Sequence, residues 1–127
     1  MYMKARSGHI IISHIDYKDL YPVYEDIYKI YMKETNQDIS TEEATVQLDV
    51  GLSDLKSNKK PAGFNKPGNV RFIFPIKDDK VIEFYFYRNV KSQDVVNVTQ
   101  KISGLLNNKG IEHNIEYDKI LSIFKKK

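Results

Sequence analysis

Side chains suited to binding chemistry are concentrated in one stretch, VRFIFPIKDDKVIEFYFYRNV at residues 70–90. Two tyrosines stand at alternate positions there, and an arginine lies near each end of the stretch. Tyrosine rings stack on nucleic-acid bases or pack against a protein, and guanidinium groups bind phosphate or carboxylate oxygens. The sequence therefore predicts a binding surface, whose residues are Arg71, Ile73, Tyr85, Tyr87 and Arg88.

A lysine-rich segment precedes this stretch and carries no acidic residue. Its prolines and glycines predict an exposed loop over residues 56–69. Such a loop would suit an acidic partner or a phosphate backbone. The basic residues of this predicted loop are Lys56, Lys59, Lys60 and Lys66.

Catalytic and metal-binding chemistry has little support in the sequence. The chain has no cysteine, and its three histidines are His9, His14 and His113. His9 and His14 are five positions apart in an expected strand, so they point to opposite faces. No serine lies in the strand-turn-helix elbow typical of serine nucleophiles. The sequence predicts no catalytic residue, no metal site and no cofactor, and it favours a binding protein over an enzyme.

The elements that would position these residues follow from hydrophobic periodicity and from start and stop signals. They are a strand at 8–15, a helix from Leu20, a helix from 40, two strands joined by the KDDK turn at 77–80, a helix over 92–110 and a strand at 111–117. The helix from 40 begins with a capping box, Ser40 to Glu43, and Ser92 caps the later one.

Two features of the helical segments have a functional alternative. Tyrosines follow the apolar stripe of the first helix, and we expect them at the core margin with their hydroxyl groups in water. They are Tyr24 and Tyr31 beside the stripe, with Tyr17, Tyr21 and Tyr28 at its edge. In the second helical segment, Ala44, Leu48 and Leu55 around DVG resemble the core of a helix-turn-helix motif. That resemblance implies contact with duplex DNA.

Without the second helix, the element order is β-α-β-β-α-β. This order is typical of an α+β, ferredoxin-like sandwich, in which helices pack on one face of an antiparallel sheet. The 127 residues are expected to form a single domain, 1–127, with the basic loop at 56–69. Residues 118–127 contain apolar side chains at helical spacing and form a candidate docking tail.

In such a sheet the helices would bury the phenylalanine face of the two central strands. The other face would then present Tyr85 and Tyr87 with Ile73 beside them. An aromatic and apolar sheet face is commonly covered by a partner subunit, so we expect self-association as a homodimer or binding of a protein partner. The alternative is single-stranded RNA or DNA stacked on the same tyrosines, since KVIEFYFY resembles the aromatic central strand of RNA-recognition modules.

A second alternative is enzymatic. A strand, two helices and the strand pair NVRFIFPIKDDKVIEFYFYR, together about residues 8–90, resemble RelE-type ribonuclease toxins. The resemblance implies cleavage of messenger RNA. It also implies that Arg71, Tyr85, Tyr87 and Arg88 orient phosphate and move protons.

Charge and hydropathy limit the cellular setting. The net charge of +3 is mildly basic, below the dense positive field of a dedicated nucleic-acid binder. No apolar run approaches the roughly 18–20 residues that span a bilayer, so no membrane association is expected. The absence of cysteine fits a reducing compartment, and the sequence favours a cytoplasmic protein.

Overall fold

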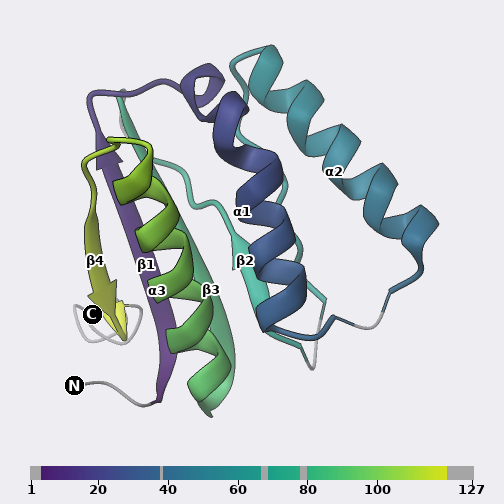
Figure 1. Cartoon of the computed structure of the whole chain (residues 1–127), viewed down its shortest axis with the longest axis vertical. Helices are drawn as coiled ribbons and strands as arrows, with labels where there is room; N and C mark the ends of the chain where they lie inside the picture. The colour runs from purple at the N-terminus through teal and green to yellow at the C-terminus, as the bar shows by residue number, and fades with distance from the viewer. Residues whose placement is uncertain (1–3, 38, 67–68, 78–79, 120–127) are drawn as a thin grey trace.

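The computed structural model describes residues 4–37, 39–66, 69–77 and 80–119. The described residues form four strands and three α-helices (Figure 1). The elements are β1 (Ala5–Ser13), the 3-10 turn η1 (Tyr17–Leu20), α1 (Tyr21–Glu34), α2 (Thr41–Lys56), β2 (Arg71–Ile73), β3 (Val81–Ser92), α3 (Gln93–Asn108) and β4 (Asn114–Tyr117).

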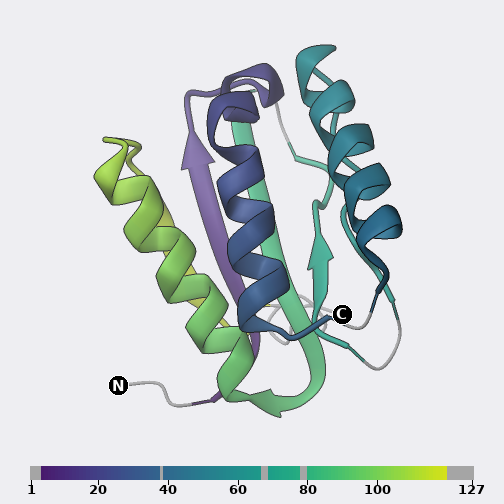
Figure 2. The same cartoon turned by 45° about the vertical axis from the view of Figure 1, so that its right-hand side comes forward.

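The four strands form one antiparallel sheet in the order β2-β3-β1-β4. The long strands β1 and β3 lie side by side at its centre, with Ile10 opposite Phe84 and His9 opposite Tyr85. Helices α1 and α3 cover one face of the sheet, and α2 lies beyond α1, away from the strands (Figures 1 and 2). The predicted α+β class with an antiparallel sheet is confirmed.

The core lies between the sheet and α1 and α3. Strand alternation sends the phenylalanines of β2 and β3 to this side, where Phe72, Phe84 and Phe86 are buried and their rings contact one another. In β1, Gly8 allows the close approach of α3, because a Cβ at this position would lie 2.1 Å from Thr99 Oγ1. Because glycine has no side chain, α3 can pack closely against β1 at this position.

The helix starts agree with the predicted caps. The Ser40 hydroxyl accepts a hydrogen bond from Glu43 N at 3.1 Å, and the Ser92 hydroxyl accepts one from Asp94 N at 3.1 Å. These bonds satisfy backbone donors that have no partner within the helix. Cap chemistry therefore fixes where α2 and α3 begin.

The tyrosines of α1 lie deeper than the sequence suggested. Tyr24, Tyr28 and Tyr31 are all buried, so the expected margin position with wet hydroxyl groups is wrong for these three. Tyr17 is half-buried and Tyr21 is exposed, as a margin position requires. The Tyr31 ring packs against Phe86, and its hydroxyl donates to the backbone oxygen of Val70 at 2.6 Å. A hydroxyl that finds a buried acceptor does not need water, which is why the Tyr31 ring can enter the core.

Helix α2 is one continuous helix from Thr41 to Lys56, so the helix-turn-helix reading of this segment is wrong. Its only buried residues are Gly51 and Leu55, while Val46 and Val50 are exposed. The Asp49–Gly51 step stays helical because Gly51 packs directly against the Tyr24 ring of α1. Close helix packing, rather than a turn, explains this glycine.

The segment between α2 and β2 is tied to the sheet. Phe64 exchanges two backbone hydrogen bonds with Phe72, at 2.7 and 2.8 Å, and Gly63 precedes it with a φ of 77°. This pairing closes the outer edge of β2. Of the predicted KDDK turn, Asp78 and Asp79 lie outside the described residues, as do residues 120–127 of the candidate docking tail.

Candidate functional site

The candidate site lies on the side of the sheet away from α1 and α3, which we call the second face. Cross-strand neighbours here are Arg71 opposite Tyr87, and Ile73 opposite Tyr85. The predicted binding residues Arg71, Ile73, Tyr85 and Tyr87 are all half-buried. The described residues that form the second face are Ser7, His9 and Ile11 of β1, Arg71 and Ile73 of β2, Glu83, Tyr85 and Tyr87 of β3, and Asn114 and Glu116 of β4.

A buried carboxylate organises the centre of the second face. Glu83 Oε2 lies 2.6 Å from His9 Nδ1, and Glu83 Oε1 lies 3.1 Å from Lys77 Nζ and 3.2 Å from Lys119 Nζ. Burial by itself would raise the pKa of Glu83, but the hydrogen bonds from His9, Lys77 and Lys119 lower it to about 2. The carboxylate is therefore ionised near neutral pH, and its charge is compensated locally.

Ser7, His9 and Glu83 stand in the order of a serine, histidine and acid relay. Since an ionised carboxylate only accepts hydrogen bonds, His9 Nδ1 carries the proton and donates to Glu83. His9 Nε2 then lies 3.0 Å from the Ser7 hydroxyl oxygen. Ser7 and His9 are fully enclosed, with at most 1% of either residue exposed, so no substrate carbonyl can reach the hydroxyl. The relay is a structural network that joins β1 to β3.

The two candidate tyrosines differ in their surroundings. Tyr85 stacks on His9 with ring centroids 4.5 Å apart, so one side of its ring is already occupied. Burial, followed by the negative charge of Glu83, raises the pKa of Tyr85, so its phenol keeps its proton near neutral pH. The Tyr87 hydroxyl donates to Asn89 Oδ1 at 3.0 Å, which orients that ring toward the C-terminal end of β3. A phenol that keeps its proton, as that of Tyr85 does, is not prepared to act as a general base.

Two predicted arginines meet at this end of β3. Arg71 and Arg88 line a cavity of about 210 Å³, which we call the arginine pocket. In the part of the chain that the structure describes, neither guanidinium group takes part in an ion pair. The residues that line the arginine pocket are Asn69, Arg71, Arg88, Asn89 and Val90. Its lining contains two cationic side chains and no acidic one.

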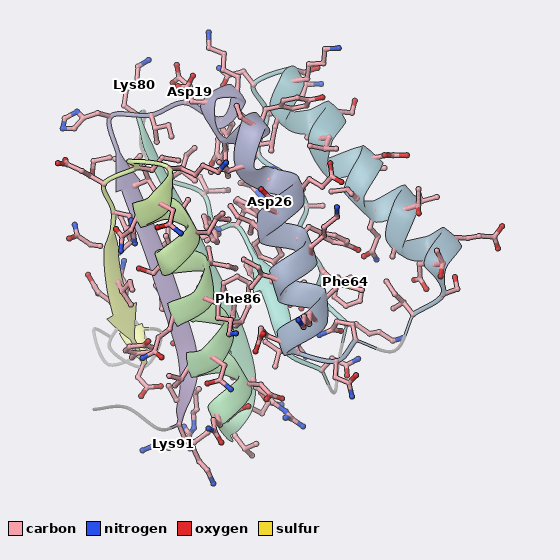
Figure 3. All side chains as sticks on the ribbon, in the orientation of Figure 1. Asp19, Asp26, Phe64, Lys80, Phe86 and Lys91 are labelled. Atoms are coloured by element: carbon pink, nitrogen blue, oxygen red, sulfur yellow. The ribbon has the colours of Figure 1, made fainter. Side chains whose placement is uncertain are left out.

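The predicted basic loop does not form one surface. Lys56, Lys59 and Lys60 flank Asn58, which lines a small cavity with Lys80 before the start of β3. Lys66 lies near the arginine pocket instead, because its carbonyl accepts a hydrogen bond from Asn69 N at 3.4 Å. Figure 3 shows Lys80 and Lys91 at opposite ends of β3. Of the four lysines, only Lys66 lies beside the candidate binding residues.

The remaining histidines lie near a larger cavity of about 520 Å³, whose lining includes Ile11 of β1 and Asn114 of β4. His113 is held by the Ser103 hydroxyl at 2.6 Å and by the carbonyl of Ile111 at 2.9 Å, so both of its ring nitrogens are occupied. His14 lines the same cavity. Within the described ranges, no group of three or more histidine or acidic residues could hold a metal ion.

Sequence reasoning did not find the partners of these residues. The pairing of His9 with Glu83 and the two asparagines of the arginine pocket were not predicted. The alternation of β1 and β3 showed which residues share a face, and Asn89 follows the candidate Arg88 directly. Alternation and sequence adjacency therefore pointed to these residues, but neither gives the distance between residues on different strands.

No protein-family model, curated protein or solved structure matches this chain. The site must therefore be interpreted from its own chemistry. Among the described residues, no helix has the length and apolar character needed to cross a bilayer.

Proposed function

We propose that this chain is a non-catalytic binding protein that holds single-stranded nucleic acid on the second face, at the end where the arginine pocket lies. The observation that carries the proposal is the pairing of Tyr87 with Arg71 across β2 and β3. Beside them lies a second arginine, Arg88, which has no ion-pair partner among the described residues. Single-stranded nucleic acid is bound by this combination, since bases stack on aromatic rings while basic side chains hold the backbone.

The electrostatics of the second face support this ligand. Glu83 and Glu116 are acidic side chains among the described residues of the second face. Glu116 is exposed on β4, at the edge of the sheet opposite β2, whereas Glu83 lies at the centre of the face and would repel phosphate if it were exposed. It is buried, and Lys77, Lys119 and His9 surround its carboxylate, so its charge is compensated before any ligand arrives. The phosphate-binding groups lie at the Arg71 end, away from this carboxylate.

The decisive experiment is fluorescence anisotropy with a labelled single-stranded oligonucleotide of about 12 nucleotides, as RNA and as DNA. If two or three phosphates are contacted, affinity should fall about tenfold between about 50 and 200 mM salt. Tyr87→Ala should weaken binding about tenfold or more, because stacking contributes about 1–3 kcal/mol per base. Tyr21→Ala, an exposed tyrosine at the start of α1, is the matched control and should bind as the parent does.

Three outcomes would contradict the proposal. They are absence of binding to either oligonucleotide, binding that is insensitive to salt, and binding that survives Tyr87→Ala. Cleavage of the RNA would overturn the non-catalytic part, and it would instead support the ribonuclease alternative with Arg71, Tyr85, Tyr87 and Arg88.

Self-association on the same face is the second candidate function. The observation that favours it is Ile73, a half-buried isoleucine between Arg71 and Tyr85 on the second face. However, of the described large apolar side chains that are exposed, Val46 and Val50 lie on α2, and Val90 lines the arginine pocket. Light scattering should report a dimer if this candidate is correct, and Ile73→Lys should then give a monomer.

We also infer that the architecture is a ferredoxin-like sandwich with α2 as an inserted helix. The strand order β2-β3-β1-β4 and the placement of α1 and α3 on one face support this assignment. An experimental structure in which α2 packs on the sheet, or in which α1 and α3 lie on opposite faces, would contradict it.

A further inference from the structure

The arginine pocket differs from an open groove in its size. Binding sites for small molecules usually measure about 300–1,000 Å³, and this cavity of about 210 Å³ is smaller. A nucleobase with its sugar would not fit among these five residues, whereas one phosphate group would. The pocket therefore suits the charged end of a ligand rather than its bases.

The composition of the pocket points to the same group. Only three residues of the chain are arginine, in a chain with 20 basic residues, and two of the three line this pocket. Arginine presents a planar fork of N–H donors that matches two phosphate oxygens at once, which a lysine ammonium group cannot do. Asn69 and Asn89 add amide groups that can donate further hydrogen bonds.

Charge distinguishes the two kinds of phosphate that a nucleic acid offers. A phosphate within the chain is a diester with one negative charge, and sugars leave it on two sides. A terminal phosphate is a monoester with a charge of about −1.5 to −2 at pH 7 and a single ester bond. Two unpaired arginines in a small acid-free cavity match a group of about two charges that enters from one side.

We propose, on the basis of the proposed function, that the arginine pocket binds the terminal phosphate of a single-stranded nucleic acid, while Tyr87 stacks on a base near that end. Arg71 belongs both to the phosphate site and to the stacking site, because it lines the arginine pocket and lies directly across from Tyr87. The 5′ and the 3′ phosphate share this chemistry. The protein then recognises an end of the strand and not its sequence.

The test compares three oligonucleotides of one sequence, which carry a 5′ phosphate, a 3′ phosphate or no phosphate. We expect one phosphorylated end to bind about tenfold more tightly than the unphosphorylated strand at pH 7.5. The advantage should shrink as the pH falls below about 6, where the phosphate monoester loses its second charge. The lining of the pocket contains no histidine and no carboxylate, so the change would report on the ligand.

Arg88→Lys and Arg71→Lys test the guanidinium fork directly. Each keeps the positive charge, so salt-dependent binding of the unphosphorylated strand should persist, while the preference for the phosphorylated end should be lost. Lys109→Gln, an exposed lysine after α3, is the control that should leave the preference unchanged. If all three strands bind equally and binding still depends on Tyr87, the end-recognition proposal is wrong and the proposed function stands. If none of the strands binds, both fail.

Discussion

At the scale of single residues, Glu83 should contribute most to the stability of the second face. Glu83→Gln keeps the size of the side chain but removes the negative charge that His9, Lys77 and Lys119 contact. Breaking a buried ion pair in this way should lower the free energy of unfolding by about 3 kcal/mol at pH 7. Urea denaturation followed by circular dichroism would measure the difference. Glu116→Gln, on the same face but exposed, is the matched control and should change stability by less than about 0.5 kcal/mol.

The same carboxylate predicts a pH dependence with a definite sign. The pKa of Glu83 is about 2 in the folded chain and lies below its ordinary value of 4.5. Between these values the unfolded chain binds more protons, so the stabilisation is fully present above about pH 4.5 and is lost as the pH falls toward 2. The stability difference between the parent and Glu83→Gln should therefore shrink across this window. A difference that stays constant with pH would show that Glu83 acts by packing alone.

The role of Glu83 was beyond the reach of the sequence for a physical reason. Alternation along β3 predicts that Glu83 shares a face with Tyr85 and Tyr87, and it does. The partner His9 is 74 positions away, and only the register of β1 against β3 brings the two together. Register depends on the packing of the whole sheet, so a local pattern gives the face of a side chain and not its neighbour.

At the scale of elements, two glycines give opposite predictions. A Cβ at Gly51 of α2 would lie 2.7 Å from the Tyr24 ring, and Tyr24 is buried, so the ring has little room to move. Gly51→Ala should therefore lower the free energy of unfolding by about 1–3 kcal/mol, despite the better helix propensity of alanine. Gly104 of α3 faces open space, and Gly104→Ala should stabilise the chain by up to about 1 kcal/mol. If both variants are more stable, α2 does not sit this close to α1.

Helix starts were predictable because a cap is a local interaction between residues two or three positions apart, as at Ser40 and Ser92. The depth of Tyr31 was not predictable, since its acceptor is the carbonyl of Val70, 39 positions away. The helix-turn-helix reading failed at Gly51 for a similar reason. That glycine serves a contact with another helix, and local spacing cannot distinguish such a contact from a turn.

At the scale of the whole molecule, the order of strands and helices along the chain predicted the class of the fold. This class, an antiparallel sheet with helices on one face, depends mainly on which segments are strands and which are helices. The position of α2 was left open, as its apolar residues at Leu48, Leu52 and Leu55 suit any neighbouring surface. In the structure, this helix packs on α1 and not on the sheet (Figure 2). The molecule thus consists of a sheet covered by α1 and α3, and of a third helix, α2, whose packing depends on α1.

This arrangement predicts an uneven distribution of stability. Helix α2 buries only Gly51 and Leu55, whereas α1 and α3 bury whole faces against β1 and β3. Amides of α2 should therefore exchange with deuterium through a local opening that requires less free energy than global unfolding, while the amides of β3 exchange only by global unfolding. Leu55→Ala should speed exchange in α2 much more than Val50→Ala, because Leu55 is fully buried and Val50 is exposed. Protection of α2 equal to that of β3 would instead make the three helices one cooperative unit.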